Sequence, residues 1–88
     1  MVNQGIILQV KLVYFASVRE AMATSSEEVT LAENIKTIAQ LKKMLAKQNN
    51  KFKQIPQVLS AVNQTIVKED ALIHKNDEVA LFPPVTGG

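Results

Sequence analysis

The group of this chain best suited to covalent chemistry is the carboxylate at the end of residues 83–88, after Gly87 and Gly88. A carboxylate is a poor acyl donor, but ATP can convert it into an acyl-adenylate. A sulfur nucleophile can then displace AMP and leave a thiocarboxylate. Glycine suits these steps because no side chain crowds the acyl carbon and the thin backbone can enter a narrow channel. The residues alone leave two interpretations open, an activated tail or a terminus without a function.

Two prolines separate this end from the rest of the chain. Pro83 and Pro84 cannot continue a central strand, because proline fixes φ and has no backbone N–H. They favour a stiff, extended exit, which reduces the entropy lost when the tail is ordered in the site of another protein. At about 3.3 Å per residue, residues 83–88 can reach on the order of 20 Å from the domain.

The interior of the chain shows no catalytic or metal-binding pattern. His74 is the only histidine and the chain has no cysteine, so we expect His74 to be structural rather than a metal ligand. No serine lies in a nucleophile-elbow pattern, and Gly87 and Gly88 precede no helix and so form no phosphate loop. Solubility explains the acidic pair Asp77 and Glu78 more simply than acid–base chemistry does. We therefore expect no bound cofactor, no metal and no free-standing enzyme.

Composition indicates one small globular domain. The chain has 88 residues, of which 47% are hydrophobic, and this is enough for one modest core. Gln9 and Lys11 interrupt the apolar start at residues 6–8, which argues against a secretory signal and a membrane span. The absence of cysteine is compatible with the cytoplasm. We expect a cytoplasmic protein in which residues 1–5 are a flexible leader.

Charge is distributed in blocks along the chain. Residues 1–35 and 54–88 each carry a net charge of −2, whereas residues 36–53 contain six lysines and no acid, for +6. Such a block could bind nucleic acid. It has no arginine, however, and only one aromatic residue, Phe52, for contacts with phosphates and bases. We therefore interpret the block as a solvated helix face and expect no nucleic-acid partner.

Hydrophobic periodicity predicts an α+β domain over residues 6–82. Runs rich in β-branched residues, or alternating between apolar and polar, predict the strands. These strands are residues 6–15, 27–31, 58–62, 65–67 and 78–82. A short helix is predicted over residues 16–23, where Ser17 and Glu20 have the spacing of a capping box. This order predicts a mixed sheet of four to five strands, with one main helix packed on one face and a short helix after the first strand.

The main helix is predicted over residues 38–48. Thr37 and Gln40 have the spacing of a second capping box. Asn49 and Asn50 end the helix, since asparagine tolerates the left-handed conformation of a C-terminal cap. The apolar stripe that faces the sheet consists of Ile38, Leu41 and Leu45.

One face of the sheet is predicted to stay open. The positions of the first and last strands that face the helix are Leu8, Val10, Leu12, Val79 and Leu81. The same alternation turns Phe15 and Phe82 to the other face, where Ile66 could join them. Together they would form an apolar patch of the kind that binds a partner. The alternative is that the irregular segment around Phe52 and Ile55 covers them.

Three segments of the chain resemble the small subunit of molybdopterin synthase, a sulfur-carrier family. They are residues 10–20, VKLVYFASVRE, residues 61–67, AVNQTIV, and residues 76–88, NDEVALFPPVTGG. The likeness covers nearly the whole chain beyond the leader. The ending combined with the middle motif is specific, whereas a bare terminal pair of glycines is shared with ubiquitin-like modifiers and the thiamine-pathway sulfur carrier.

The resemblance implies a ubiquitin-like β-grasp fold and a role as sulfur carrier in molybdenum cofactor biosynthesis. In that family an activating enzyme uses ATP to adenylate the terminal glycine, and a sulfur donor protein then supplies the sulfur. The thiocarboxylated tail enters the large subunit of the synthase, in an expected heterotetramer. There it gives sulfur to cyclic pyranopterin monophosphate and builds the dithiolene of molybdopterin.

The resemblance also implies residue roles. Gly88 would carry the thiocarboxylate, and Gly87 would let the tail thread into its site. The contacts with partners would be Phe15, Ile66, Phe82, Pro83, Pro84, Val85 and Thr86. The chain would be a non-catalytic sulfur-donor subunit of a sulfurtransferase. It departs from the family in residues 1–5 and in the lysine-rich helix, which leaves open which surface charges meet the activating enzyme.

Other functions stay open at this point. The chain could be a ubiquitin-like modifier conjugated through Gly88 to lysines of target proteins, or the sulfur carrier of another pathway such as that of thiamine. It could also be a pure binding domain that uses Phe15, Ile66 and Phe82 and has an idle tail. Tail deletion would spare the function only in this last case.

Overall fold

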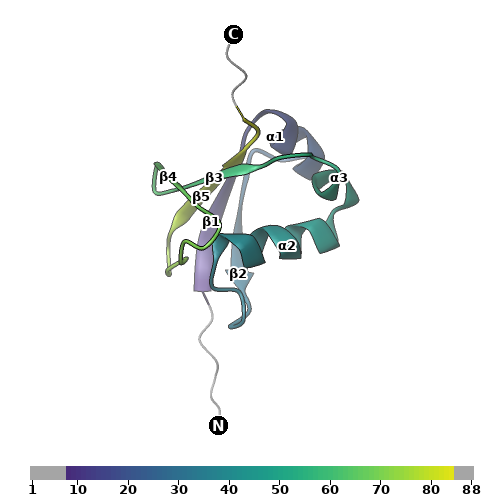
Figure 1. Cartoon of the computed structure of the whole chain (residues 1–88). Helices are drawn as coiled ribbons and strands as arrows, with labels where there is room; N and C mark the ends of the chain where they lie inside the picture. Colours follow the sequence, from purple (N-terminus) through teal and green to yellow (C-terminus); the bar gives the residue numbers. More distant parts are fainter. Residues whose placement is uncertain (1–7, 85–88) are drawn as a thin grey trace.

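Five strands form one mixed sheet in the order β2-β1-β5-β3-β4 (Figure 1). The strands are β1 (Leu8–Tyr14), β2 (Ser26–Leu31), β3 (Leu59–Val62), β4 (Thr65–Val67) and β5 (Glu78–Phe82). The central pair, β1 and β5, is parallel, and every other pairing is antiparallel. The strand predictions are confirmed apart from small differences at the ends, and residues 6 and 7 of the first predicted strand lie outside the described residues. The mixed α+β sheet is therefore as expected.

The computed structural model describes residues 8–84. The predicted leader, residues 1–5, lies outside the described residues. So do Val85, Thr86, Gly87 and Gly88, the last four residues of the predicted tail. In the described part, no helix has the length and apolar character needed to cross a membrane.

Three helices complete the fold, and Figure 1 shows them gathered on one side of the sheet. They are α1 (Ala16–Met22), α2 (Ile38–Gln48) and α3 (Asn50–Lys53). The bounds of α2 are those that the sequence predicts. Its capping box is present, since the Gln40 backbone N–H donates to Thr37 Oγ1 at 3.2 Å and the Thr37 N–H donates to Gln40 Oε1 at 3.0 Å. Local side-chain chemistry thus fixes where the main helix begins.

Two predictions about helix ends are wrong. The capping box of Ser17 and Glu20 does not form, because the N-cap of α1 is Phe15 and no side chain caps it. Phe15 follows β1 with extended backbone, and its carbonyl oxygen accepts the first hydrogen bonds of the helix. Asn49 ends α2 with φ −139°, which is extended rather than left-handed. Its side chain instead accepts from the Phe52 N–H at 2.9 Å, so Asn49 is also the N-cap of α3.

The core lies between α2 and the face of the sheet that the alternation predicts. Leu12, Val79 and Leu81 are fully buried there, with the predicted stripe of α2 packed against them. Phe52 enters this core from α3 and is only 4% exposed. It therefore does not cover the other face of the sheet, and the irregular segment expected around it contains a helix.

The hairpin between β3 and β4 is held to the start of β5. Asn63 and Gln64 have φ of 49° and 72°, as a two-residue turn requires. The Asn63 Nδ2 group donates to Asp77 Oδ1 at 2.9 Å, and the Asn63 Oδ1 accepts from the Glu78 N–H at 3.0 Å. Asp77 is buried and also accepts from the His74 N–H at 2.7 Å. Solubility was therefore the wrong explanation for Asp77, which is a structural hydrogen-bond acceptor.

Candidate functional site

The sheet face away from α2 is open, and it carries the three apolar residues that the sequence singles out. Phe15 is 50% exposed and Ile66 is 72% exposed, while Phe82 is half-buried. Phe15 continues the alternation of β1 with extended backbone, so its side chain lies on the side of Val13. The expectation of an uncovered sheet face is confirmed. The alternative, in which the segment around Phe52 and Ile55 covers this face, is excluded.

Strand register joins these residues into one continuous surface. Ile66 pairs with Ala61, Ala61 with Ala80, and Ala80 with Val13, which makes an apolar row across β4, β3, β5 and β1. Directly paired residues point to the same face of a sheet. Leu59 pairs with Phe82 in the next row toward the end of β5. We call this surface the outer-face patch; it consists of Val13, Phe15, Leu59, Ala61, Ile66, Ala80 and Phe82, of which Ala61 is buried beneath its neighbours at 8% exposed.

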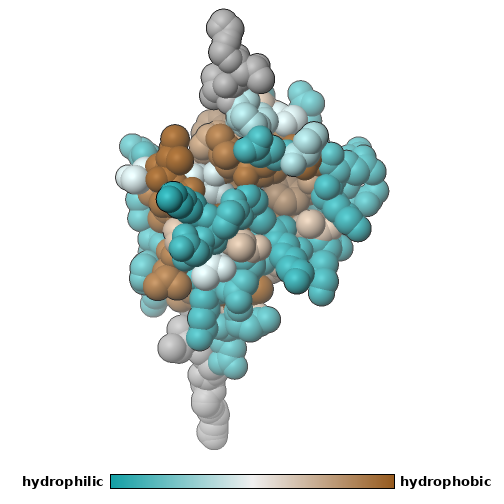
Figure 2. All heavy atoms as spheres, in the orientation of Figure 1, coloured by the Kyte–Doolittle hydropathy of each residue, from teal (hydrophilic) through white to brown (hydrophobic). Residues whose placement is uncertain are grey.

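The outer-face patch occupies only the half of the open face that lies toward the end of β5. In the other half, Lys11 of β1 pairs with Glu28 of β2 and with Glu78 of β5. Figure 2 shows hydrophobic side chains over β4 and around the base of the C-terminal trace, and mainly hydrophilic ones over α2 and α3. The apolar part of the surface therefore lies beside the point where the chain leaves the sheet.

The ends of β1 and β5 meet at this point. The Phe15 N–H donates to the Leu81 carbonyl oxygen at 3.1 Å, which brings Phe15 beside the residue that precedes Phe82. Pro83 and Pro84 follow directly, outside any strand, and are half-buried. The structure thus brings Phe15, Ile66, Phe82 and the two prolines to one end of the sheet.

The patch rests on a rigid support. The hydrogen bonds of the Asn63 side chain, donated to Asp77 and accepted from the Glu78 N–H, fix the turn that leads into β4, the short edge strand that carries Ile66. Beneath β1, the buried Tyr14 hydroxyl donates to Glu27 Oε2 at 2.6 Å. Burial, reinforced by this carboxylate, raises the pKa of Tyr14, so its phenol stays protonated and keeps the hydrogen bond.

Residues 8–84 contain no group of three or more His, Cys, Asp or Glu that could hold a metal ion. His74 is exposed, with Nδ1 3.8 Å from Asp77 Oδ2, and its backbone N–H contributes to the turn before β5. The side chain of His74 makes no other hydrogen bond or ion pair within residues 8–84, so its structural role stays a prediction.

Four members of the outer-face patch were absent from the residues predicted to bind partners. Val13 and Ala80 share the alternation of Phe15 and Phe82, so their place on this face could be read from sequence. Leu59 and Ala61 could not, because β3 alternates weakly and its pairing with β5 depends on contacts distant in sequence. No local signal points to them.

The comparisons with known proteins decide the family. A family model described as the ThiS family matches residues 12–88. The chain belongs to the ThiS family. A relative of this ThiS-family chain, the molybdopterin synthase sulfur carrier subunit of Escherichia coli (strain K12), is 40% identical over 82 residues, covering 90% of this chain and 99% of the relative. The chain therefore groups with the sulfur carrier subunits of molybdopterin synthase, as the resemblance implied.

Solved structures agree with this grouping. A molybdopterin converting factor, subunit 1, from Pyrococcus furiosus has a TM-score of 0.78 and 31% identity, covering 89% of this ThiS-family chain and 99% of that chain. Small archaeal modifier protein 1 from Methanosarcina acetivorans has a TM-score of 0.75 at 19% identity, covering 96% and 100%. At that identity the second likeness concerns the fold alone. The ubiquitin-like β-grasp fold is confirmed.

One similar structure is a complex. Molybdopterin-converting factor subunits 1 and 2 of Helicobacter pylori were solved together, and the matching chain has a TM-score of 0.62 and 20% identity, covering 92% of this chain and 100% of that chain. This likeness also concerns the fold. The roles of the predicted site residues, including Gly87 and Gly88, remain predictions. The last four of these residues lie outside the described residues.

Proposed function

We propose that this chain carries sulfur as a thiocarboxylate on Gly88 and delivers it inside the large subunit of molybdopterin synthase. One observation carries the proposal: the outer-face patch lies at the end of the sheet where Pro83 follows β5. A partner that covers the patch is thereby positioned at the base of the tail. The Escherichia coli relative and the Helicobacter pylori complex support a large subunit as that partner.

The proposal assigns a step to each part of the tail. An activating enzyme uses ATP to adenylate the Gly88 carboxylate, and sulfur from a donor protein displaces AMP. Pro83 and Pro84 stiffen the exit, Val85 and Thr86 span the channel of the large subunit, and Gly87 keeps the backbone thin. Cyclic pyranopterin monophosphate then takes one sulfur from each of two thiocarboxylated chains to form a dithiolene, and each Gly88 returns to a carboxylate. In this proposal the chain binds no cofactor during the cycle, and the cycle takes place in the cytoplasm.

Burial of the outer-face patch provides the binding energy in this proposal. Exposed aromatic and aliphatic side chains on a rigid surface typically dominate the energy of an interface. Phe15 and Ile66 are such residues, and the strands that hold them lose little conformational freedom on binding. The large subunit would thus gain its affinity from the sheet and leave the tail free to react.

Reconstituted dithiolene synthesis with the cognate large subunit and activating enzyme tests the proposal. Deletion of Gly88 is expected to abolish product formation, whereas deletion of residues 1–5 should leave the rate unchanged. Wild-type product formation without Gly88 would refute the role of the tail. Higher-mass conjugates on a denaturing gel of cell extract, lost with Gly88, would instead identify a protein modifier.

A further inference from the structure

The lysine-rich block forms a surface on α2 and α3 that is largely unneutralised. Its exposed members are Lys36, Lys43, Lys47, Lys51 and Lys53. The sixth, Lys42, is the one that makes an ion pair within residues 8–84: its Nζ lies 2.6 Å from Glu69 Oε2 and donates to the Val58 carbonyl oxygen at 2.6 Å. The other five make no ion pair with a described residue, so their positive charge faces outward.

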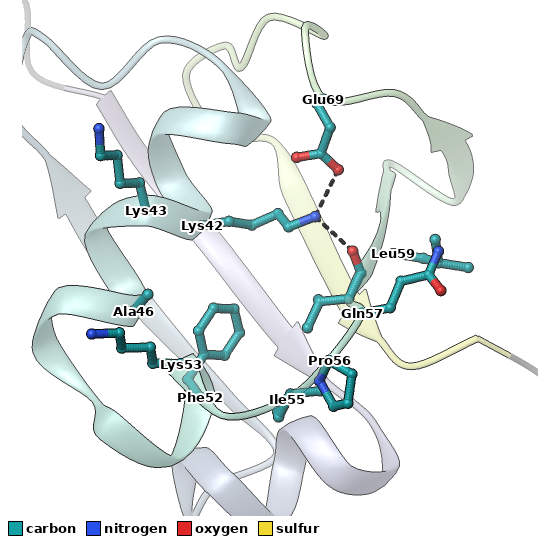
Figure 3. Close-up of a pocket in the computed structure, with 11 residues that line it drawn as sticks. Lys42, Lys43, Ala46, Phe52, Lys53, Ile55, Pro56, Gln57, Leu59 and Glu69 are labelled. Atoms are coloured by element: carbon teal, nitrogen blue, oxygen red, sulfur yellow. Dashed lines mark hydrogen bonds and ion pairs between the residues drawn. The ribbon is translucent and has the colours of Figure 1, made fainter.

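Three of the six lysines, Lys42, Lys43 and Lys53, line an open hollow of about 390 Å³ between α2, α3 and residues 54–59, and Glu69, the ion-pair partner of Lys42, lines it as well. The lining of the hollow includes four apolar side chains, Ala46, Phe52, Ile55 and Pro56 (Figure 3). Figure 3 also shows that the amino groups of Lys42, Lys43 and Lys53 point in different directions. They do not converge on a single small anion, as a phosphate site would require.

The hollow and the outer-face patch share one residue, Leu59. Leu59 lines the hollow, and the same residue pairs with Phe82 at the end of β5. A protein seated on the outer-face patch can therefore extend a segment past the start of β3 into the hollow. The two surfaces differ in character, because the patch is apolar and the hollow combines apolar side chains with a cationic rim.

We propose that this hollow is a docking site for an acidic segment of a partner protein that inserts an apolar side chain. Carboxylates of the segment would face the lysine rim, which favours encounter and register, while the apolar side chain would cover Ile55 and Pro56, the accessible apolar residues of the lining. Nucleic acid fits poorly, since Phe52 is only 4% exposed and no aromatic ring is available for base stacking. The proposal does not depend on the chemistry of Gly88.

Amide shifts of the full chain, titrated with synthetic peptides, test the site. The probes are a short Asp/Glu peptide with two central leucines, the same peptide with glycines in place of the leucines, and a single-stranded DNA oligonucleotide. The leucine peptide is expected to shift amides of residues 42–59 and to bind at least about fivefold more tightly than the glycine peptide, because burial of leucine contributes to affinity. Equal affinity of the two peptides, or tighter binding of the DNA at these residues, overturns the proposal.

Matched variants separate the effect of the hollow on peptide binding from the effect of net charge. The double variant Lys43→Glu and Lys53→Glu should weaken the leucine peptide about tenfold. The double variant Lys68→Glu and Lys75→Glu changes the net charge equally at exposed sites outside the hollow and should weaken it by less than about twofold. Equal weakening by both variants would show a non-specific charge effect and contradict the site.

Discussion

The two faces of the sheet arise from the same alternating pattern, but one face is buried and the other is open. On the face toward α2, Val79 and Leu81 of β5 are fully buried. On the opposite face, Ala80 and Phe82 of the same strand remain partly exposed, and no described element covers them. Two neighbours in sequence, Leu81 and Phe82, therefore belong to two different surfaces. One face makes the domain stable, and we propose that the other makes it useful to a partner.

This difference shows why an exposed apolar residue carries more functional information than a buried one. A buried leucine in a small domain is explained by the need for a core. A row of apolar residues on an uncovered face lowers solubility and gives the isolated domain little stability, so it indicates a partner. Substitutions on one face at a time test whether the two faces have these separate roles.

The largest effect on stability is expected from Leu81→Ala. Leu81 is fully buried, so its truncation should lower the free energy of unfolding by about 3 kcal/mol through lost burial and a cavity. Urea denaturation measures this loss. Phe82→Ala, one residue further on, should cost about 1 kcal/mol or less because Phe82 is half-buried. Equal losses of unfolding free energy in the two variants would contradict the distinction between a buried face and an open face.

The largest effect on binding is expected on the other face, from Phe15→Ala. Its affinity for the large subunit should fall by about 2 kcal/mol, roughly thirtyfold in Kd, because an exposed aromatic anchor is lost. Its thermal stability should change little, since the Phe15 side chain caps nothing.

Isothermal titration with the large subunit measures this change. Leu72→Ala is the matched control, because Leu72 is also a large exposed hydrophobic residue, at 60%, but lies outside the outer-face patch. A comparable loss of affinity in the Leu72 variant would show that exposed apolar area, rather than the patch, determines binding.

A smaller, pH-dependent effect is expected from Tyr14→Phe on the inner face. At neutral pH the variant should be about 1 kcal/mol less stable, because the hydrogen bond to Glu27 is lost. Burial raises the pKa of Tyr14, so above pH about 10 the unfolded chain releases the phenol proton while the folded chain keeps it. The stability from this group is present below that pH and is lost as the pH rises.

Urea denaturation of the two proteins between neutral and alkaline pH checks the sign. Between pH 10 and 11 the wild type should lose about 1 kcal/mol more than Tyr14→Phe, because only the wild type has this proton to release. Parallel curves for the two proteins would show that Tyr14 titrates alike in the folded and unfolded chain.

The smallest effect is expected from Ser60→Ala, and it is a gain. Ser60 is only 2% exposed, and its Oγ has no hydrogen-bond partner among residues 8–84. Replacing a buried, unpaired hydroxyl with a methyl group should raise the free energy of unfolding by up to about 1 kcal/mol. A loss of stability in denaturant would indicate that the hydroxyl is hydrogen-bonded in solution.

Local chemistry made part of the fold predictable. The bounds of α2 follow from the Thr37 and Gln40 capping box and from an apolar stripe with helical spacing. The bounds of β5 follow from alternation between the turn at Asn76 and the prolines. Each signal lies within a few residues of the element it defines, so no knowledge of the tertiary structure was needed.

Tertiary contacts decided what the sequence could not reveal. Ser17 and Glu20 have the right spacing for a cap, but the hydrogen bond from Phe15 to Leu81 determines where α1 begins. The role of Asp77 depends on Asn63, which is fourteen residues away in sequence. For the same reason, Phe15 and Phe82 could be assigned to an open face, whereas Leu59 and Ala61 required the pairing of β3 with β5.

Alkylation of the chain isolated from cells with the pathway active tests the central proposal most directly. The chain has no cysteine, so a thiol-selective reagent can label only a thiocarboxylate. This matters because oxidation of one of its three methionines adds nearly the same mass as replacing oxygen by sulfur. We predict a single adduct, mapped by peptide mass spectrometry to Gly88 and absent when Gly88 is deleted. An unlabelled chain from those cells, or an adduct elsewhere, would contradict the account.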